Sequence, residues 1–152
     1  MNPKKVSQSL LQYNALIRET DELYHNVAKN LRLPDCAFWI LYSLRESELP
    51  LTQSDICNSL YYSKQTVNSA LKKLETDGYI ALCSSSDRRR KQLHLTEKGY
   101  LLTANTIDRV IDAELEALSD LSEQDRALFL AVFEKYTTIL KQKMKVFERR
   151  TS

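Results

Sequence analysis

The segment from Ser63 to Thr96, SKQTVNSALKKLETDGYIALCSSSDRRRKQLHLT, limits the fold of this chain more than any other stretch. Its first part carries Val67, Leu71 and Leu74 at positions i, i+4 and i+7, the spacing that puts apolar side chains on one face of a helix. The opposite face and its flanks carry hydroxyls, amides and ammonium groups, which can hydrogen-bond base edges and phosphates. The segment therefore predicts an amphipathic helix with a polar face suited to DNA, and Ser63 is placed to cap it.

A β-hairpin is predicted directly after this helix. Gly78 stands where the helix needs a left-handed residue to end it. Residues 80–83 and 92–95 each alternate large apolar residues with smaller or polar ones, at the period of two that is typical of half-buried strands. The run between them, 84–91, is polar and basic. We interpret the helix and the hairpin together as a DNA-reading helix with its wing.

Positive charge is concentrated in the same segment. Residues 63–94 carry seven Lys or Arg against three Asp or Glu, a net charge of +4, whereas the rest of the chain carries 15 against 17. A polyanion would dock where this charge lies, although a solvated charge run is the alternative interpretation. The expected DNA-binding residues are Ser63, Lys64, Gln65, Asn68, Ser69, Lys72 and Lys73 on the helix and Arg88, Arg89, Arg90 and Lys91 at the wing.

The composition predicts a mainly helical protein with one domain over residues 1–152. The chain has only two glycines and three prolines, which argues for long helices and against glycine-rich phosphate loops. Periodicity and capping residues predict five further helices: Lys4–Asn30, one capped by Asp35, one from Thr52 to about Leu60, one of about 20 residues opening at Thr96, and one from Ser122 to the C-terminus. Residues 4–30 and 100–148 offer long apolar stripes, so we expect both ends of the chain to form a dimerisation region.

The cysteines and the apolar runs indicate a reduced, cytoplasmic protein that does not enter a membrane. Cys36, Cys57 and Cys83 are odd in number and widely spaced. Cys57 is expected to be a buried, inert thiol between two helices. The longest apolar run, Ala37–Tyr42, is far shorter than the ~20 residues that span a bilayer.

The order of these elements resembles the MarR family of winged helix-turn-helix regulators, over residues 33–99. The run DRRRKQLHLTEKG, residues 87–99, is similar to the family's wing signature of D-x-R followed by L-x-L-T-x-x-G. The run TVNSALKKLETDGYI, residues 66–80, likewise resembles the family's recognition helix and the strand after it.

The resemblance implies an obligate homodimer that places one recognition helix of each subunit in a major groove of a pseudo-palindromic operator. It also implies that Arg89 enters the neighbouring minor groove while Asp87 orients it, which suits the negative potential of a narrow groove. Arg88, Arg90, Lys64 and Lys91 are expected to contact phosphates.

Other candidate sites are weaker. Phe38, Trp39 and Tyr42 are predicted to be buried, and core packing is the favoured interpretation over an effector cavity of the kind many family members have. His25 and His94 have no carboxylate or thiol at ligand spacing, so no metal site is predicted. No arrangement of nucleophile and base and no nucleotide-binding motif is present, so we expect neither a cofactor nor catalysis.

The sequence therefore predicts a mainly α protein with a small β-hairpin wing, acting as a homodimeric, DNA-binding transcriptional regulator. A repressor that responds to a small molecule or another signal is expected. The alternative is a protein-interaction module that keeps the winged-helix fold without binding DNA.

Overall fold

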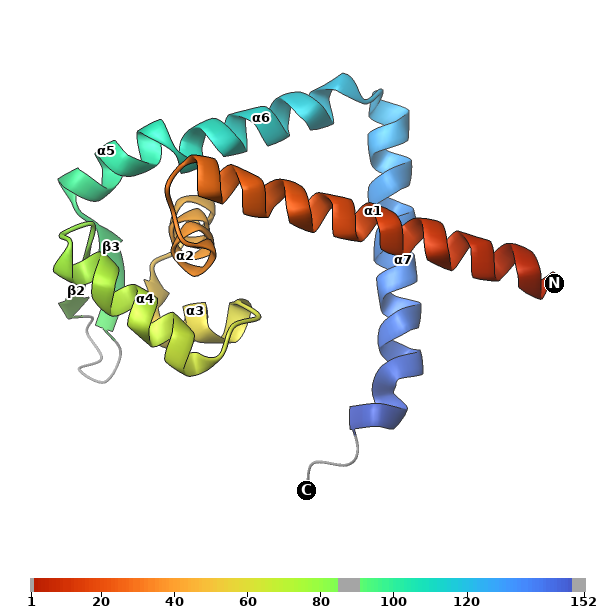
Figure 1. The fold of residues 1–152 in the computed structure, drawn as a ribbon, viewed down its shortest axis with the longest axis horizontal. Coiled ribbons are helices and arrows are strands. Elements are labelled where there is room, and N and C mark those ends of the chain that lie inside the picture. The colour runs from red at the N-terminus through yellow and green to blue at the C-terminus, as the bar shows by residue number, and fades with distance from the viewer. Residues whose placement is uncertain (1, 85–90, 149–152) are drawn as a thin grey trace. The chain divides into compact units, whose positions relative to one another are not determined.

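The computed structural model describes residues 2–84 and 91–148, and Figure 1 shows their helices and strands. The elements in chain order are α1 (Pro3–Asn30), α2 (Asp35–Glu46), β1 (Leu51–Thr52), α3 (Gln53–Ser59), α4 (Lys64–Thr76), β2 (Ile80–Ser84), β3 (Lys91–Leu95), α5 (Glu97–Asn105), α6 (Ile107–Asp120) and α7 (Glu123–Glu148). The chain divides into two compact units, residues 1–109 and 110–152, with the division inside α6. The predicted fold class, mainly helical with a small β wing, is confirmed.

The core of the first unit lies between α2, α3, α4 and the sheet, and α6 contributes to it at its first residue. Helix α2 packs against α1, α4 and β3, and α4 packs in turn against α3 and β2. The largest fully buried side chains of this core are Phe38, Ile40, Leu41, Ile56, Val67, Thr103 and Ile107. Burying several branched and aromatic side chains of this size is the main stabilising contribution to the lobe, at about 1.5–3 kcal/mol each.

The first two helices begin close to where the sequence placed them, with one difference. Helix α1 starts at Pro3, and the side chain of Asn2 caps it by accepting the backbone N–H of Lys4 at 3.1 Å. Asp35 was predicted to cap α2, but it is the first helical residue and the N-cap position is taken by Pro34. The Asp35 carboxylate instead lies 2.8 Å from Nδ1 of His25, so a contact with α1 takes the place of the expected cap.

The sheet has three strands rather than the predicted two. Its order is β1-β3-β2, and both neighbouring pairs are antiparallel. Strand β1 contains only two residues, which pair with Leu93 and Gln92 of β3. A strand of two residues is too short to show an alternating pattern, so periodicity could not predict it. The predicted hairpin itself is confirmed, with Leu82 opposite Leu93 in its centre.

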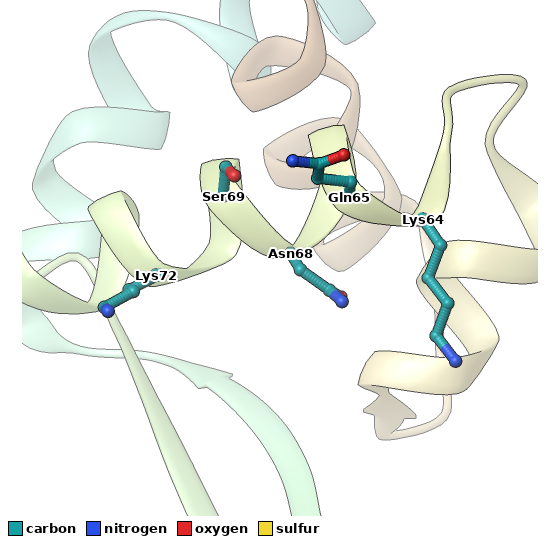
Figure 2. A pocket seen from close by; sticks show the side chains of 5 residues that line it. All are labelled: Lys64, Gln65, Asn68, Ser69 and Lys72. Carbon is teal, nitrogen blue, oxygen red and sulfur yellow. The ribbon is translucent and has the colours of Figure 1, made fainter.

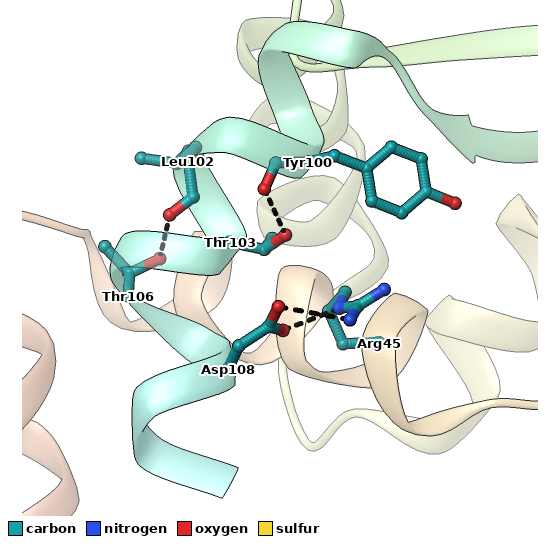
Figure 3. A network of polar contacts seen from close by, with 6 residues as sticks. All are labelled: Arg45, Tyr100, Leu102, Thr103, Thr106 and Asp108. Atoms are coloured by element: carbon teal, nitrogen blue, oxygen red, sulfur yellow. Dashed lines mark hydrogen bonds and ion pairs between the residues drawn. The ribbon is translucent and has the colours of Figure 1, made fainter. Parts of the chain in front are cut away.

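The helix predicted to open at Thr96 is divided into α5 and α6 by Thr106. The hydroxyl of Thr103 donates to the carbonyl of Tyr100 at 3.2 Å, and the hydroxyl of Thr106 donates to that of Leu102 at 2.7 Å (Figure 3). Hydroxyls that compete for backbone carbonyls in this way bend helices, and Thr106 leaves the helical conformation at φ −130°, ψ −86°. Of the residues around this break, Thr103 is fully buried whereas Leu101 is 64% exposed.

The second unit contains the rest of α6 and all of α7. Ser122 caps α7 as predicted, accepting the backbone N–H of Asp125 at 3.0 Å. None of the described residues of α7 is buried, although its stripe includes Phe129, Phe133 and Ile139. In the described part of the chain, every helix is too short or too polar to cross a lipid bilayer.

Candidate nucleic-acid interface

Helix α4 is held in place by its apolar face, its two ends and the neighbouring helix α3. Val67 is fully buried, and Leu71 and Leu74 are each only 5% exposed. At the start, the Ser63 hydroxyl accepts the backbone N–H of Thr66 at 3.1 Å, as predicted. At the end, Gly78 adopts a positive φ of +82°, so the helix ends there in the left-handed conformation that glycine favours.

The preceding helix is fixed by a reciprocal cap. The Thr52 hydroxyl accepts the backbone N–H of Asp55 at 3.1 Å, while the Asp55 carboxylate accepts the backbone N–H of Thr52 at 2.8 Å. Such capping boxes satisfy two N–H groups that would otherwise lack partners at the helix start. Helices α3 and α4 therefore have defined ends and pack against each other, which places their polar side chains at defined positions.

The outward face of α4 gathers five of the predicted DNA-binding side chains. Figure 2 shows these residues, which line one shallow surface hollow: Lys64, Gln65, Asn68, Ser69 and Lys72. Four of them are exposed and Asn68 is half-buried. The two ammonium groups come from opposite ends of the row, with amides and a hydroxyl between them. A surface of this kind can neutralise phosphates at its ends and hydrogen-bond base edges in its middle.

Two of the predicted helix residues are engaged elsewhere. Lys73 does not line the hollow, and its ammonium group lies 3.4 Å from the carboxylate of Asp77, one turn further along the helix. Asn68 lines the hollow, but its Oδ1 accepts a hydrogen bond from Nε2 of Gln53 at 2.6 Å. The thiol of Cys57 is a weaker donor to the same oxygen, at 3.6 Å. Sequence reasoning missed Gln53, because nothing in its local pattern indicates a contact 15 residues away.

The wing is described only at its base. Lys91 is exposed at the start of β3 and stands opposite Ser84, the last residue of β2. The predicted DNA-contacting residues Arg88, Arg89 and Arg90 and the orienting residue Asp87 lie outside the described residues.

The residues predicted as core or effector pocket form a packed aromatic cluster. The ring centroids of Phe38 and Trp39 lie 5.0 Å apart, those of Trp39 and Tyr42 lie 5.3 Å apart, and those of Tyr24 of α1 and Trp39 lie 5.1 Å apart with the rings tilted by 46°. Such spacings are typical of favourable aromatic pairs. Phe38 is fully buried, but Trp39 and Tyr42 are half-buried, so the expectation that all three are buried holds only for the first. The contacts favour packing between α1 and α2, and a role in effector binding stays a prediction.

The three thiols have different surroundings. Cys83 is exposed on β2, Cys57 is half-buried rather than buried as predicted, and Cys36 is buried. Burial raises the pKa of the Cys36 thiol, and the nearby Cys57 adds to this effect. Burial likewise raises the pKa of the Tyr62 hydroxyl, helped by Asp35 and Cys36. A thiol with a raised pKa is a poor nucleophile at neutral pH, so Cys36 is chemically protected.

Two ion pairs across the first unit were not predicted. The guanidinium of Arg45 makes a two-point contact with the Asp108 carboxylate, with Nε 2.6 Å from Oδ1 and Nη2 3.1 Å from Oδ2 (Figure 3). The hydrogen bond to Asp108 raises the pKa of Arg45. His25, predicted to have no carboxylate at ligand spacing, pairs with Asp35. Among the residues that the structure describes, no three His, Cys, Asp or Glu side chains gather as a metal site would require.

Comparison with known proteins gives a consistent result. Residues 32–91 match the model of the MarR family. The HTH-type transcriptional regulator PecS of Dickeya dadantii (strain 3937) is 28% identical over 129 residues, covering 83% of this chain and 76% of PecS. The uncharacterised HTH-type transcriptional regulator YwoH of Bacillus subtilis (strain 168) is 28% identical over 97 residues, covering 64% and 70% of the two chains. The crystal structure of S. aureus MepR in its DNA-binding conformation superposes with a TM-score of 0.71 at 26% identity, covering 84% of this chain and 98% of MepR.

Proposed function

We propose that this chain, whose residues 32–91 match the model of the MarR family, recognises specific double-stranded DNA through helix α4 and regulates transcription there. The observation that carries this proposal is the exposed row of polar and basic side chains on α4, opposite a fully packed apolar face. An α-helix fits the major groove of B-DNA, where each base pair presents a distinct set of donors and acceptors.

Lys64 and Lys72 would neutralise phosphates on the two sides of the groove. Ser63 would also favour a phosphate contact, because the helix that it caps has the positive end of its dipole facing outward there. Lys91 stands at the base of the wing, which would follow the backbone toward the minor groove. Arg88, Arg89 and Arg90 complete the proposed contact set, with Arg89 in the minor groove and Asp87 orienting it.

We further propose that the active form is a homodimer. Helices α1 and α7 both expose long apolar stripes, with Leu11 66% and Val146 69% exposed, and α1 buries only Ala28. Apolar surface of this extent on exposed helices is typical of a subunit interface. Two copies related by a twofold axis would present two α4 helices to successive major grooves, about 34 Å apart.

Repression controlled by a signal fits this geometry. A change in the distance between the two α4 helices would move them off the ~34 Å spacing of successive major grooves. Binding to both half-sites of the operator would then weaken together. The signal would be a small molecule or another change. Phe38, Trp39 and Tyr42 are the candidate residues for a small-molecule pocket, although their ring contacts favour core packing. The protein would act in the cytoplasm. It would act without a catalytic role, since the polar residues of α4 line an open surface hollow.

Binding to the promoter region of the chain's own gene tests the proposal. We expect a dimer to shift this fragment with an affinity that falls steeply with salt, because each phosphate contact releases counterions. Arg89→Ala should cost roughly 1–3 kcal/mol of operator binding. Arg32→Ala, at an exposed arginine that lies after α1 and outside both the proposed dimerisation region and the proposed DNA-binding set, is the matched control and should leave binding unchanged.

Lys72→Ala distinguishes a phosphate contact from a base contact. Equal loss of affinity for the operator and for random DNA would make Lys72 a phosphate contact, whereas a loss confined to the operator would make it a base reader. Failure of an intact dimer to shift any promoter fragment at any salt concentration would favour the alternative, a protein-interaction module on the same scaffold.

A further inference from the structure

The hydrogen bonds of Asn68 restrict what this residue can read in the groove. Gln53 and Cys57 are four residues apart on α3, so they lie on the same face of that helix and both reach Asn68 on α4. Gln53 donates to Oδ1 of Asn68 at 2.6 Å, and the Cys57 thiol lies 3.6 Å from the same oxygen. An amide oxygen has two lone pairs, so these two donors occupy its acceptor capacity.

The remaining hydrogen-bonding group of Asn68 is its amide nitrogen, which carries two N–H donors and no acceptor. Figure 2 shows the Asn68 side chain directed to the same side of α4 as Lys64, among the residues that line the hollow. Asn68 therefore offers a donor, and only a donor, to a molecule that occupies this face.

This polarity excludes the familiar pairing of asparagine with adenine. In that pairing Oδ1 accepts from the adenine N6 amino group while the amide nitrogen donates to N7. Because Gln53 already occupies Oδ1 of Asn68, the N6 amino group of an adenine opposite Asn68 would meet the amide nitrogen of Asn68. Two donors would then face each other without an acceptor. Guanine presents acceptors at O6 and N7, and thymine presents one at O4, so both suit a donor.

We propose that Asn68 is a specificity-determining residue that reads a keto base, guanine or thymine, and that Gln53 is the positioning residue that sets this preference. The inference rests on the proposed function, since it requires α4 to enter a major groove. It gives Gln53 a role in specificity although Gln53 itself lies on α3 and need not touch a base. It also explains why a half-buried residue lies in the middle of an otherwise exposed polar row.

Selection of bound fragments from a pool of randomised operators tests the proposal with the full-length protein. The wild type should retain guanine or thymine about tenfold over adenine and cytosine at one position in each half-site, the scale expected for hydrogen-bond readout of one base. Asn68→Ala should lose the preference at that position and keep it elsewhere.

Gln53→Glu is the decisive variant. Its carboxylate can only accept, so Asn68 must turn its amide nitrogen toward α3 and its Oδ1 toward the groove. The preferred base at that one position should then change from guanine or thymine to adenine or cytosine. Gln53→Leu removes the donor without supplying an acceptor. The base preference at the operator position read by Asn68 should then weaken, so that fragments with adenine there are also retained.

Matched measurements separate this inference from a purely structural role. Asn58→Asp adds the same charge at an exposed position of the same helix, α3, and should leave every base preference unchanged. Circular dichroism melting shows that each variant is folded, and a structural role would lower overall affinity without changing one base preference. A wild-type preference for adenine, or a Gln53→Glu protein with the wild-type preference, would overturn the inference while leaving the proposed function intact. Absence of any sequence preference in the wild-type dimer would overturn both.

Discussion

Replacing Gly99 by alanine should destabilise the protein strongly, although Gly99 lies in a helix where alanine is normally the better residue. The backbone at Gly99 is helical and needs no positive φ, so helix propensity alone predicts a gain of roughly 0.5–1 kcal/mol. A Cβ at this position would, however, lie 2.0 Å from the carbonyl oxygen of Tyr79 and 3.1 Å from Cδ2 of Leu95. The closer contact is with backbone, which cannot rotate away, so α5 must move away from the residue that precedes β2.

The cost of this movement follows from the contacts that it breaks. The Tyr79 carbonyl accepts the backbone N–H of Thr96 at 3.0 Å, and the Thr96 hydroxyl donates to the carbonyl of Gly78 at 2.5 Å. Overpacking of a tight site costs about 1–3 kcal/mol, and each hydrogen bond contributes about 0.5–1.5 kcal/mol. After subtraction of the propensity gain, Gly99→Ala should lose about 3 kcal/mol in the free energy of unfolding.

The other glycine provides a matched control with a different mechanism. At Gly78 a Cβ would meet only Cδ of the Lys98 side chain, at 3.8 Å, so Gly78→Ala creates no clash. Its cost comes from the positive φ of +82°, which disfavours an L residue by roughly 1–2 kcal/mol. Urea unfolding followed by circular dichroism, at one fixed protein concentration because a dimer's stability depends on it, compares both variants with the wild type. A Gly99→Ala protein that is as stable as the wild type, or more stable than Gly78→Ala, would refute this reasoning.

Two further predictions concern the ion pair and the thiols. A double-mutant cycle with Arg45→Met and Asp108→Asn should give a coupling free energy of about 1 kcal/mol in urea unfolding. The contact is bidentate, but both side chains remain about a third exposed, which limits its strength. Additive effects of the two substitutions would show that the pair is fully solvated. A thiol reagent at pH 8 should modify Cys83 first, Cys57 more slowly and Cys36 only on unfolding. Burial raises the pKa of the Cys36 thiol in the folded state, so the neutral thiol stabilises the fold fully below about pH 9, and this contribution is lost as the pH rises further. The free energy of unfolding of the wild type should therefore fall more than that of Cys36→Ala between about pH 8 and pH 10.

Features that depend on neighbouring residues were predictable from the sequence. The caps at Thr52, Ser63 and Ser122 each require a hydroxyl three residues before the N–H that it accepts, and all three are formed. The buried face of α4 follows from apolar residues at helical spacing, and the left-handed Gly78 follows from its position after the helix. Local geometry fixes such features, so a local pattern is enough to predict them.

Features that depend on distant residues were not predictable in the same way. Strand β1 exists because β3 offers it a partner, and its own two residues carry no pattern. The break at Thr106 is a local exception, because the Thr106 hydroxyl bonds the carbonyl of Leu102 one turn earlier; hydroxyls make the same bond within continuous helices, so the residue type alone did not predict the break. The contacts of Asp35 with His25 and of Arg45 with Asp108 join residues that only the fold brings together.

The same distinction applies within the candidate DNA-binding face. The sequence identifies which residues of α4 can face DNA, because helical spacing alone decides which side each residue takes. It does not identify which hydrogen-bonding groups remain available there, because that depends on a neighbouring helix. At Asn68 the choice between donor and acceptor is made by Gln53, 15 residues earlier. Two regulators with identical recognition helices could therefore prefer different bases if they differed at the position of Gln53, and comparison of recognition helices alone would not explain the difference.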